Sequence, residues 1–189
     1  MSNFEFYHRQ DFPDEHYNVL GRLLVEFQVL ESSITHALCI LIKLDNDSRF
    51  IDFTFTMMNE LPFKNRLKLL SNFIETHPEI YFVPYGMENR AMYLRSYKED
   101  IGKLKEGIKL ALSLEEKRNR IMHSLWLPAP KHAPQKTVTR IKVSTTVKKT
   151  KNDYEFISSS QILSIVEEIK EASHLIGVNA WYLEYLLKI

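Results

Sequence analysis

A long helical stripe of apolar residues near the start of the chain constrains its fold more than any other feature. Between about residues 14 and 43, apolar side chains recur every three or four positions, which places them on one face of a helix. The stretch from Ile34 to Leu44 is apolar nearly all round, as is typical of a helix at the centre of a bundle. The stripe consists of Leu20, Leu23, Leu24, Phe27, Leu30, Ile34, Leu38 and Leu41.

The rest of the chain favours more helices and one β hairpin. Alternating branched residues at 137–143 predict a strand, Asn152-Asp153 predicts a turn, and residues 154–157 predict the returning strand. Three prolines between residues 128 and 134 predict an irregular link before this hairpin. We therefore expect a mainly α fold, an up-and-down helical bundle of four to five helices with one protruding β hairpin. The further helices are expected at about 48–59, 62–76, 95–124 and 160–187.

Length and composition point to one domain, and nothing in them calls for an oxidising compartment. A chain of 189 residues suits a single domain, here with a basic hairpin appendage at about 127–158. The single cysteine, Cys39, excludes an internal disulfide framework. The first residues do not resemble a signal peptide, and the longest mostly apolar run, Ala37 to Ile42, is far too short to span a bilayer. We expect a cytoplasmic protein with no membrane partner.

Charge is strongly segregated along the chain. From Lys117 to Asn152 there are ten Lys or Arg residues and no Asp or Glu, which leaves 15 basic and 24 acidic residues elsewhere. Such segregation is typical of a binding site for a polyanion such as RNA. An exposed hairpin whose lysines prevent edge pairing gives the same pattern, and both interpretations stay open. The candidate RNA-binding residues are Lys117, Arg120, Arg140, Lys142, Lys148, Lys149 and Lys151.

The run Arg118-Asn119-Arg120-Ile121-Met122-His123 closes the helix expected at 95–124. An arginine is a planar, permanently charged clamp for phosphate, and a histidine can move a proton near neutral pH. Together they can hold a phosphodiester and deprotonate a ribose hydroxyl without a metal. The simpler interpretation is a surface helix end whose cations offset the negative end of the helix dipole.

Arg118, Asn119 and His123 resemble the signature of the HEPN family, the all-helical higher eukaryotes and prokaryotes nucleotide-binding domains. The context is similar too, with early helices at 23–31 and 61–70, then the motif, a basic stretch and a long helix. The resemblance covers about residues 15–187 and implies a single HEPN-like helical domain. It implies a metal-independent RNA endonuclease that works as a homodimer, with Arg118, Asn119 and His123 as its catalytic residues.

The resemblance also implies two biological settings. An active member is expected to be a toxin or phage-defence effector, with a neutralising antitoxin or regulatory partner. Other members have lost activity, so the alternative is a catalytically silent scaffold or a nucleotide- or partner-binding module. A structural helical protein with an incidental motif is the third hypothesis.

Geometry favours a site shared by two chains. On an ideal helix, residues i and i+5 lie about 140° apart, so Arg118 and His123 do not share one narrow face, whereas Asn119 and His123 do. Two copies around a two-fold axis would bring both motifs into one cleft. The sequence has no metal-ligand spacing and no Gly-rich phosphate loop, so we expect neither a metal nor a cofactor. Five further histidines are expected to be surface residues, namely His8, His16, His77, His132 and His174.

Overall fold

The computed structural model describes residues 12–41, 60–76, 90–146 and 149–187, together with Asp52 and Thr56. Side chains are described within residues 12–41, 60–76, 97–142 and 154–182, and at Asp52 and Thr56. The helix expected at 48–59 lies almost entirely outside the described residues.

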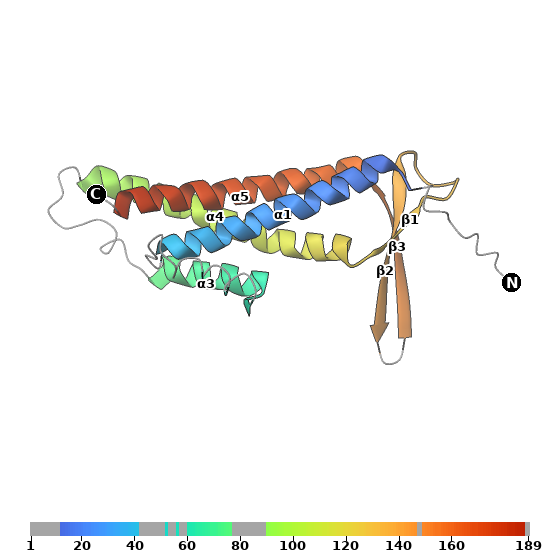
Figure 1. Cartoon of the computed structure of the whole chain (residues 1–189), viewed down its shortest axis with the longest axis horizontal. Helices are drawn as coiled ribbons and strands as arrows, with labels where there is room; N and C mark the ends of the chain where they lie inside the picture. Colours follow the sequence, from blue (N-terminus) through green and yellow to red (C-terminus); the bar gives the residue numbers. More distant parts are fainter. Residues whose placement is uncertain are drawn as a thin grey trace. The chain divides into compact units, whose positions relative to one another are not determined.

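Helices make up most of the described chain, and the prediction of a mainly α fold with a β hairpin is confirmed (Figure 1). The fourth helix begins five residues earlier than predicted, and the fifth runs through Gly177 to Leu187 as one helix. Within residues 26–41, 90–115 and 168–187, α4 runs opposite to α1 and α5 (Figure 1). The helices are α1 (Asp14–Leu41), α3 (Phe63–Thr76), α4 (Arg90–Met122) and α5 (Ser159–Leu187).

Local sequence signals set where α1 and α5 begin. The backbone N–H groups of His16 and Tyr17 bond to the carbonyl of Pro13, and acidic Asp14 lies in the positive first turn of α1. At α5, Ser158 N–H donates to Gln161 Oε1 at 2.8 Å, and Gln161 N–H donates to Ser158 Oγ at 3.3 Å. This reciprocal pair is a capping box, which satisfies two donors that the helix itself leaves open.

The predicted β hairpin is present as part of a three-stranded antiparallel sheet. Strand β1 (Leu125–Pro128) pairs with β2 (Thr137–Thr146), which pairs with β3 (Lys149–Ser158). The sequence analysis missed β1, whose last residue, Pro128, is the first residue of the predicted irregular link. The expected turn was wrong, because Asn152-Asp153 is paired within β3. A proline at the end of an edge strand loses no ladder bond, which explains why Pro128 is tolerated.

The chain divides into two compact units. Unit 1 comprises Met1–Val25 and Glu116–Glu167, and unit 2 comprises Glu26–Glu115 and Glu168–Ile189. The basic hairpin therefore belongs to the same unit as the start of α1, the end of α4 and the start of α5. The whole Arg118–His123 motif also lies in unit 1.

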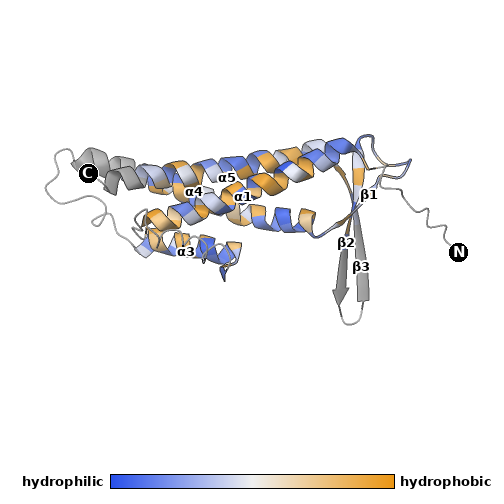
Figure 2. Cartoon of the chain, viewed as in Figure 1, coloured by the Kyte–Doolittle hydropathy of each residue, from blue (hydrophilic) through white to orange (hydrophobic). Residues whose placement is uncertain are grey.

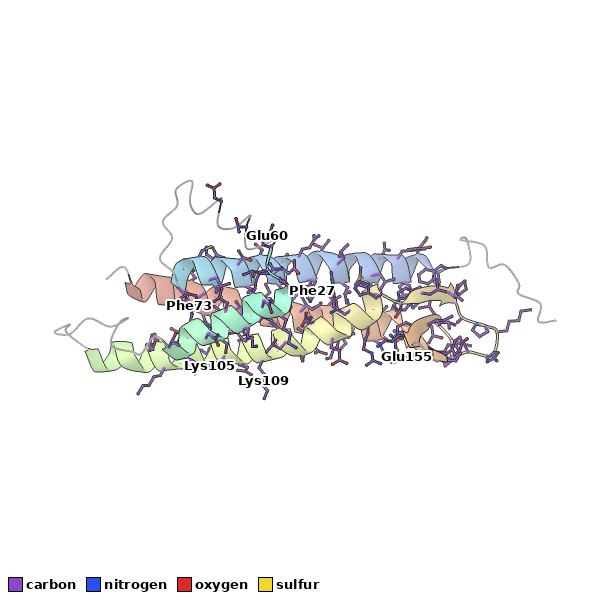
Figure 3. All side chains as sticks on the ribbon, turned by 90° about the horizontal axis from the view of Figure 1, so that it is seen from below. Phe27, Glu60, Phe73, Lys105, Lys109 and Glu155 are labelled. Carbon is purple, nitrogen blue, oxygen red and sulfur yellow. The ribbon has the colours of Figure 1, made fainter. Side chains whose placement is uncertain are left out.

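Unit 2 is a packed helical body. Leu30, Leu67, Leu104 and Ile169 are fully buried, one from each helix. The rings of Phe27 and Phe63 lie 4.7 Å apart where α1 meets α3 (Figure 3). These contacts remove apolar surface from water, at roughly 25 cal/mol per Å².

Three polar contacts help to fix the positions of the helices in unit 2. Arg66 is buried on α3, where it forms an ion pair with Glu31 at 3.3 Å and donates to Thr35 at 3.4 Å. Ser33 and Ser173 share a hydrogen bond of 2.9 Å between α1 and α5.

Unit 1 has its own apolar core beneath the sheet. Leu23, Val138, Ile162 and Val166 are fully buried. His16 is buried as well, with Nε2 3.3 Å from the carbonyl oxygen of Ile157 and its ring 5.9 Å from that of Phe12. The expectation that His16 is a surface histidine was therefore wrong, because this histidine ties α1 to β3.

Within the described residues, one helix, α1, is long and apolar enough to cross a membrane by length and composition. Half of its apolar window is buried inside the structure, and the core helix of a soluble protein meets the same criterion.

Candidate functional site

The motif occupies the last turn and a half of α4, where hydrophilic residues dominate (Figure 2). The helix ends at Met122, but the backbone N–H of His123 still bonds to the carbonyl of Asn119 at 3.1 Å. His123 therefore stays on the helical path, one turn after Asn119 and on the same face. The N–H of Ser124 bonds to the carbonyl of Ile121, which tightens the turn that leads into β1.

Arg118 and Asn119 are in direct contact. Arg118 Nη1 donates to Asn119 Oδ1 at 3.0 Å, and both side chains are partly buried. This bond occupies the side-chain carbonyl oxygen of Asn119 and fixes the orientation of its amide. The NH₂ group of the amide therefore points away from Arg118 as a donor. A guanidinium beside an amide donor is an arrangement suited to phosphate oxygens.

The His123 side chain is exposed to solvent. Its ring makes no hydrogen bond or ion pair with any other residue whose side chain the structure describes. The structure therefore joins Arg118 to Asn119 within one chain, but it joins neither of these side chains to His123.

Arg140 is not on the surface, where the sequence analysis placed it. We expected a surface contact for RNA, but the Arg140 side chain is buried. Its Nε donates to Glu155 Oε2 at 3.0 Å, and its Nη2 donates to the same oxygen. Its Nη1 donates to the Arg120 carbonyl at 3.1 Å and to Ser124 Oγ at 3.2 Å. This placement corrects the expectation, because a guanidinium with these partners stabilises the end of α4.

The sheet thus supplies hydrogen-bond donors to the last carbonyl groups of α4. Besides the bond from Arg140 to Arg120, the indole Nε1 of Trp126 on β1 donates to the carbonyl of Ile121 at 3.0 Å. Helix ends leave such carbonyl groups without intrahelical partners, so these bonds fix the turn that presents His123. Sequence reasoning missed Trp126 and Glu155, and only the position of Trp126 just beyond the helix could have signalled its role.

The other basic candidates are distributed over α4 and the hairpin. Arg120 and Lys142 are exposed, and Lys117 is partly buried. The backbones of Lys149 and Lys151 lie on β3, opposite Thr146 and Ser144, and their side chains are outside the described set. Lys148 lies outside the described residues.

A cavity of about 190 Å³ opens between α4, the sheet and α5 within unit 1. Its walls combine charged, amide and apolar side chains, and Glu155 lies beside the helix ends of this unit (Figure 3). Among the described residues, no group of three or more His, Cys, Asp or Glu side chains is placed to hold a metal ion.

No protein-family model matches this chain, and neither a curated protein nor a solved structure is significantly similar to it.

Proposed function

We propose that this protein is a metal-independent RNA endonuclease of HEPN type that acts as a homodimer. The observation that supports this most is the pairing of Arg118 with Asn119 one helical turn before an exposed, solvent-accessible His123. The basic residues between Lys117 and Asn152, apart from the buried Arg140, would add affinity for the phosphate backbone.

In the proposed reaction, His123 removes the proton from a ribose 2′-hydroxyl group. The 2′-oxygen then bonds to the adjacent phosphorus, and the bond from phosphorus to the 5′-oxygen of the next nucleotide breaks. That oxygen takes a proton from a protonated histidine or from water. Arg118 stabilises the charge that develops on the phosphate, and the Asn119 amide donates to a phosphate oxygen. The products are a 2′,3′-cyclic phosphate and a 5′-hydroxyl end, and DNA is spared because it lacks the 2′-hydroxyl.

A cytoplasmic toxin or defence effector, restrained by an antitoxin or regulatory partner, is the setting that fits this activity. The alternative is a catalytically silent binding module. The observation that favours this alternative is that no described side chain hydrogen-bonds to His123, whereas catalytic bases usually have an orienting partner.

Incubation of the purified protein with mixed RNA in EDTA tests the proposal. The parent protein should cleave RNA and leave cyclic phosphate ends, while Arg118→Ala and His123→Ala should each abolish cleavage. The double variant should be little worse than either single one, because the two residues act as a unit. His174→Ala is the matched control, since His174 is an exposed histidine on α5, away from the motif in sequence.

Two results would reject the proposal. One is cleavage that requires a divalent metal, and the other is cleavage that survives His123→Ala. If the parent protein cleaves no RNA, and a partner binds it but not the two single variants, the binding module is the correct reading.

A further inference from the structure

The cavity in unit 1 has an apolar floor. Ile121 of α4 and Ile157 of β3 are buried, and Ile165 of α5 is partly buried, and all three line the cavity. Three isoleucines from three different elements give a surface that favours a flat, weakly polar ring over water or a free ion. A phosphate ion alone gains nothing from such a floor.

One wall of the cavity offers a hydrogen-bond acceptor. Both bonds from Arg140 to Glu155 end on Oε2. Oε1 therefore remains as an acceptor, on a carboxylate that Arg140 holds in place.

The neighbouring wall offers a donor. Gln161 Oε1 accepts bonds from the N–H and the hydroxyl group of Ser158, at 2.8 and 3.1 Å. The capping box thereby fixes the orientation of the amide, and the Gln161 Nε2 group is left to donate. Glu155 and Gln161 both line the cavity, so it presents one oriented acceptor and one oriented donor. The edges of nucleobases consist of such donors and acceptors side by side.

The rim of the cavity is cationic and leads toward the motif. Lys117 and Arg120 both line it, and Arg120 is exposed. On an ideal helix Arg120 lies about 60° from Lys117 and about 60° from His123, on the arc between them. A phosphate bound to Arg120 would therefore lie between the cavity and the face that carries His123.

We infer that this cavity binds a single nucleobase of an RNA strand, belonging to a nucleotide next to the phosphodiester at His123. The isoleucine floor contacts the ring, Glu155 Oε1 and Gln161 Nε2 bond to its edge, and Arg120 contacts its phosphate. Proteins commonly recognise single-stranded RNA through unstacked bases whose edges form hydrogen bonds with protein groups. The inference rests on the proposed nuclease function for its substrate, but the base site itself can be tested without cleavage.

The test is a calorimetric titration of the purified parent protein with each of the four ribonucleoside 3′-monophosphates and, separately, with inorganic phosphate. At least one nucleotide should bind about tenfold more tightly than phosphate, because only the nucleotide uses the floor and the polar wall. Gln161→Glu should weaken that binding by about tenfold, since it replaces the donor by a second carboxylate beside Glu155. This variant keeps the capping box, because glutamate serves there as well as glutamine.

The matched control is Gln28→Glu, which makes the same chemical change at an exposed position of α1, outside the cavity. Its nucleotide binding should equal that of the parent protein. If inorganic phosphate binds as tightly as every nucleotide, the rim is an anion site only and the inference is overturned. Equal nucleotide binding by the parent protein and Gln161→Glu overturns it too.

An RNA cleavage assay in EDTA, run on the same samples, separates the two proposals. Cleavage without nucleotide binding overturns the base site and leaves the nuclease proposal intact. Nucleotide binding that Gln161→Glu weakens, without any cleavage, supports the base site and rejects the nuclease.

Discussion

At the scale of single residues, Arg140 shows how one side chain can link a sheet to a helix end. Its guanidinium bonds to Glu155 on the next strand and to the Arg120 carbonyl at the end of α4. Arg140 is buried, whereas the Glu155 side chain is 48% exposed. Removing the carboxylate therefore leaves a buried cation with fewer acceptors, which is the costly way to break a buried pair.

Glu155→Ala should lower the free energy of unfolding by about 1–3 kcal/mol, less than a fully buried pair because Glu155 is half-exposed and Arg140 keeps two other acceptors. Glu155→Gln should cost less, since its amide oxygen still accepts a bond from Arg140. Urea denaturation measures both values. Glu106→Ala is the control, because Glu106 is an exposed acid on α4. A loss in Glu155→Ala no larger than in this control would show that the pair does not stabilise unit 1.

The contact within the motif could be predicted from the sequence, whereas the residues packed around the motif could not. Arg118 and Asn119 are adjacent in the chain, so their contact needs no long-range information. The role of Arg140 depends on strand register, which pairs it with Glu155 fifteen residues later. The cavity is lined by residues of four elements, α4, β2, β3 and α5, which come together only in the folded chain. The period of apolar residues and the count of charges predict neither strand register nor contacts between distant elements.

At the scale of secondary structure, helices were the easier elements to predict. The apolar stripe of α1 runs from Leu20 to Leu41, which is about six turns, and packing buries most of its members. The strands were harder, since β1 has only four residues and owes its existence to pairing with β2. Asn152-Asp153 has the composition of a turn, yet the ladder between β2 and β3 continues beyond it to Thr146 and Lys149. Tertiary pairing outweighed the local preference.

Two glycines of α4 allow a matched test of helix packing. A Cβ atom at Gly107 would lie 2.9 Å from Leu175 Cβ on α5, whereas one at Gly102 would meet nothing within 4 Å. Gly107→Ala should destabilise the protein by about 1–3 kcal/mol through overpacking. Gly102→Ala should stabilise it by up to about 1 kcal/mol through helix propensity. Thermal unfolding of both variants measures the difference, and equal shifts of the two midpoints would mean that α4 and α5 do not approach closely at Gly107.

The basic hairpin is the element expected to bind the RNA backbone. Reversing the charge of Lys142, Lys149 and Lys151 to Glu should weaken RNA binding, and the dependence of affinity on salt should become shallower, because fewer counterions are released. The control reverses Lys105 and Lys109, which point outward from α4 in unit 2 (Figure 3). Fluorescence anisotropy at several salt concentrations compares the two sets. Equal losses in both would indicate a general charge effect and remove the hairpin from the binding site.

At the scale of the whole molecule, the motif makes a better site in two copies than in one. Arg118 and His123 lie about 140° apart around an ideal helix, and His123 has no hydrogen-bonding partner among the described side chains of its own chain. In a two-fold dimer, the arginine of one protomer can face the histidine of its partner. This arrangement makes each site dependent on both chains.

Mixing two inactive variants tests that dependence. If each site combines Arg118 of one protomer with His123 of its partner, a mixed dimer of Arg118→Ala and His123→Ala regains one intact site. After equal mixing and exchange, half of the dimers are mixed, so about a quarter of the parent activity should return. Sites confined to one chain give no recovery in any mixture. Light scattering of the parent protein at micromolar concentration provides the companion measurement, because a monomer cannot form the shared site.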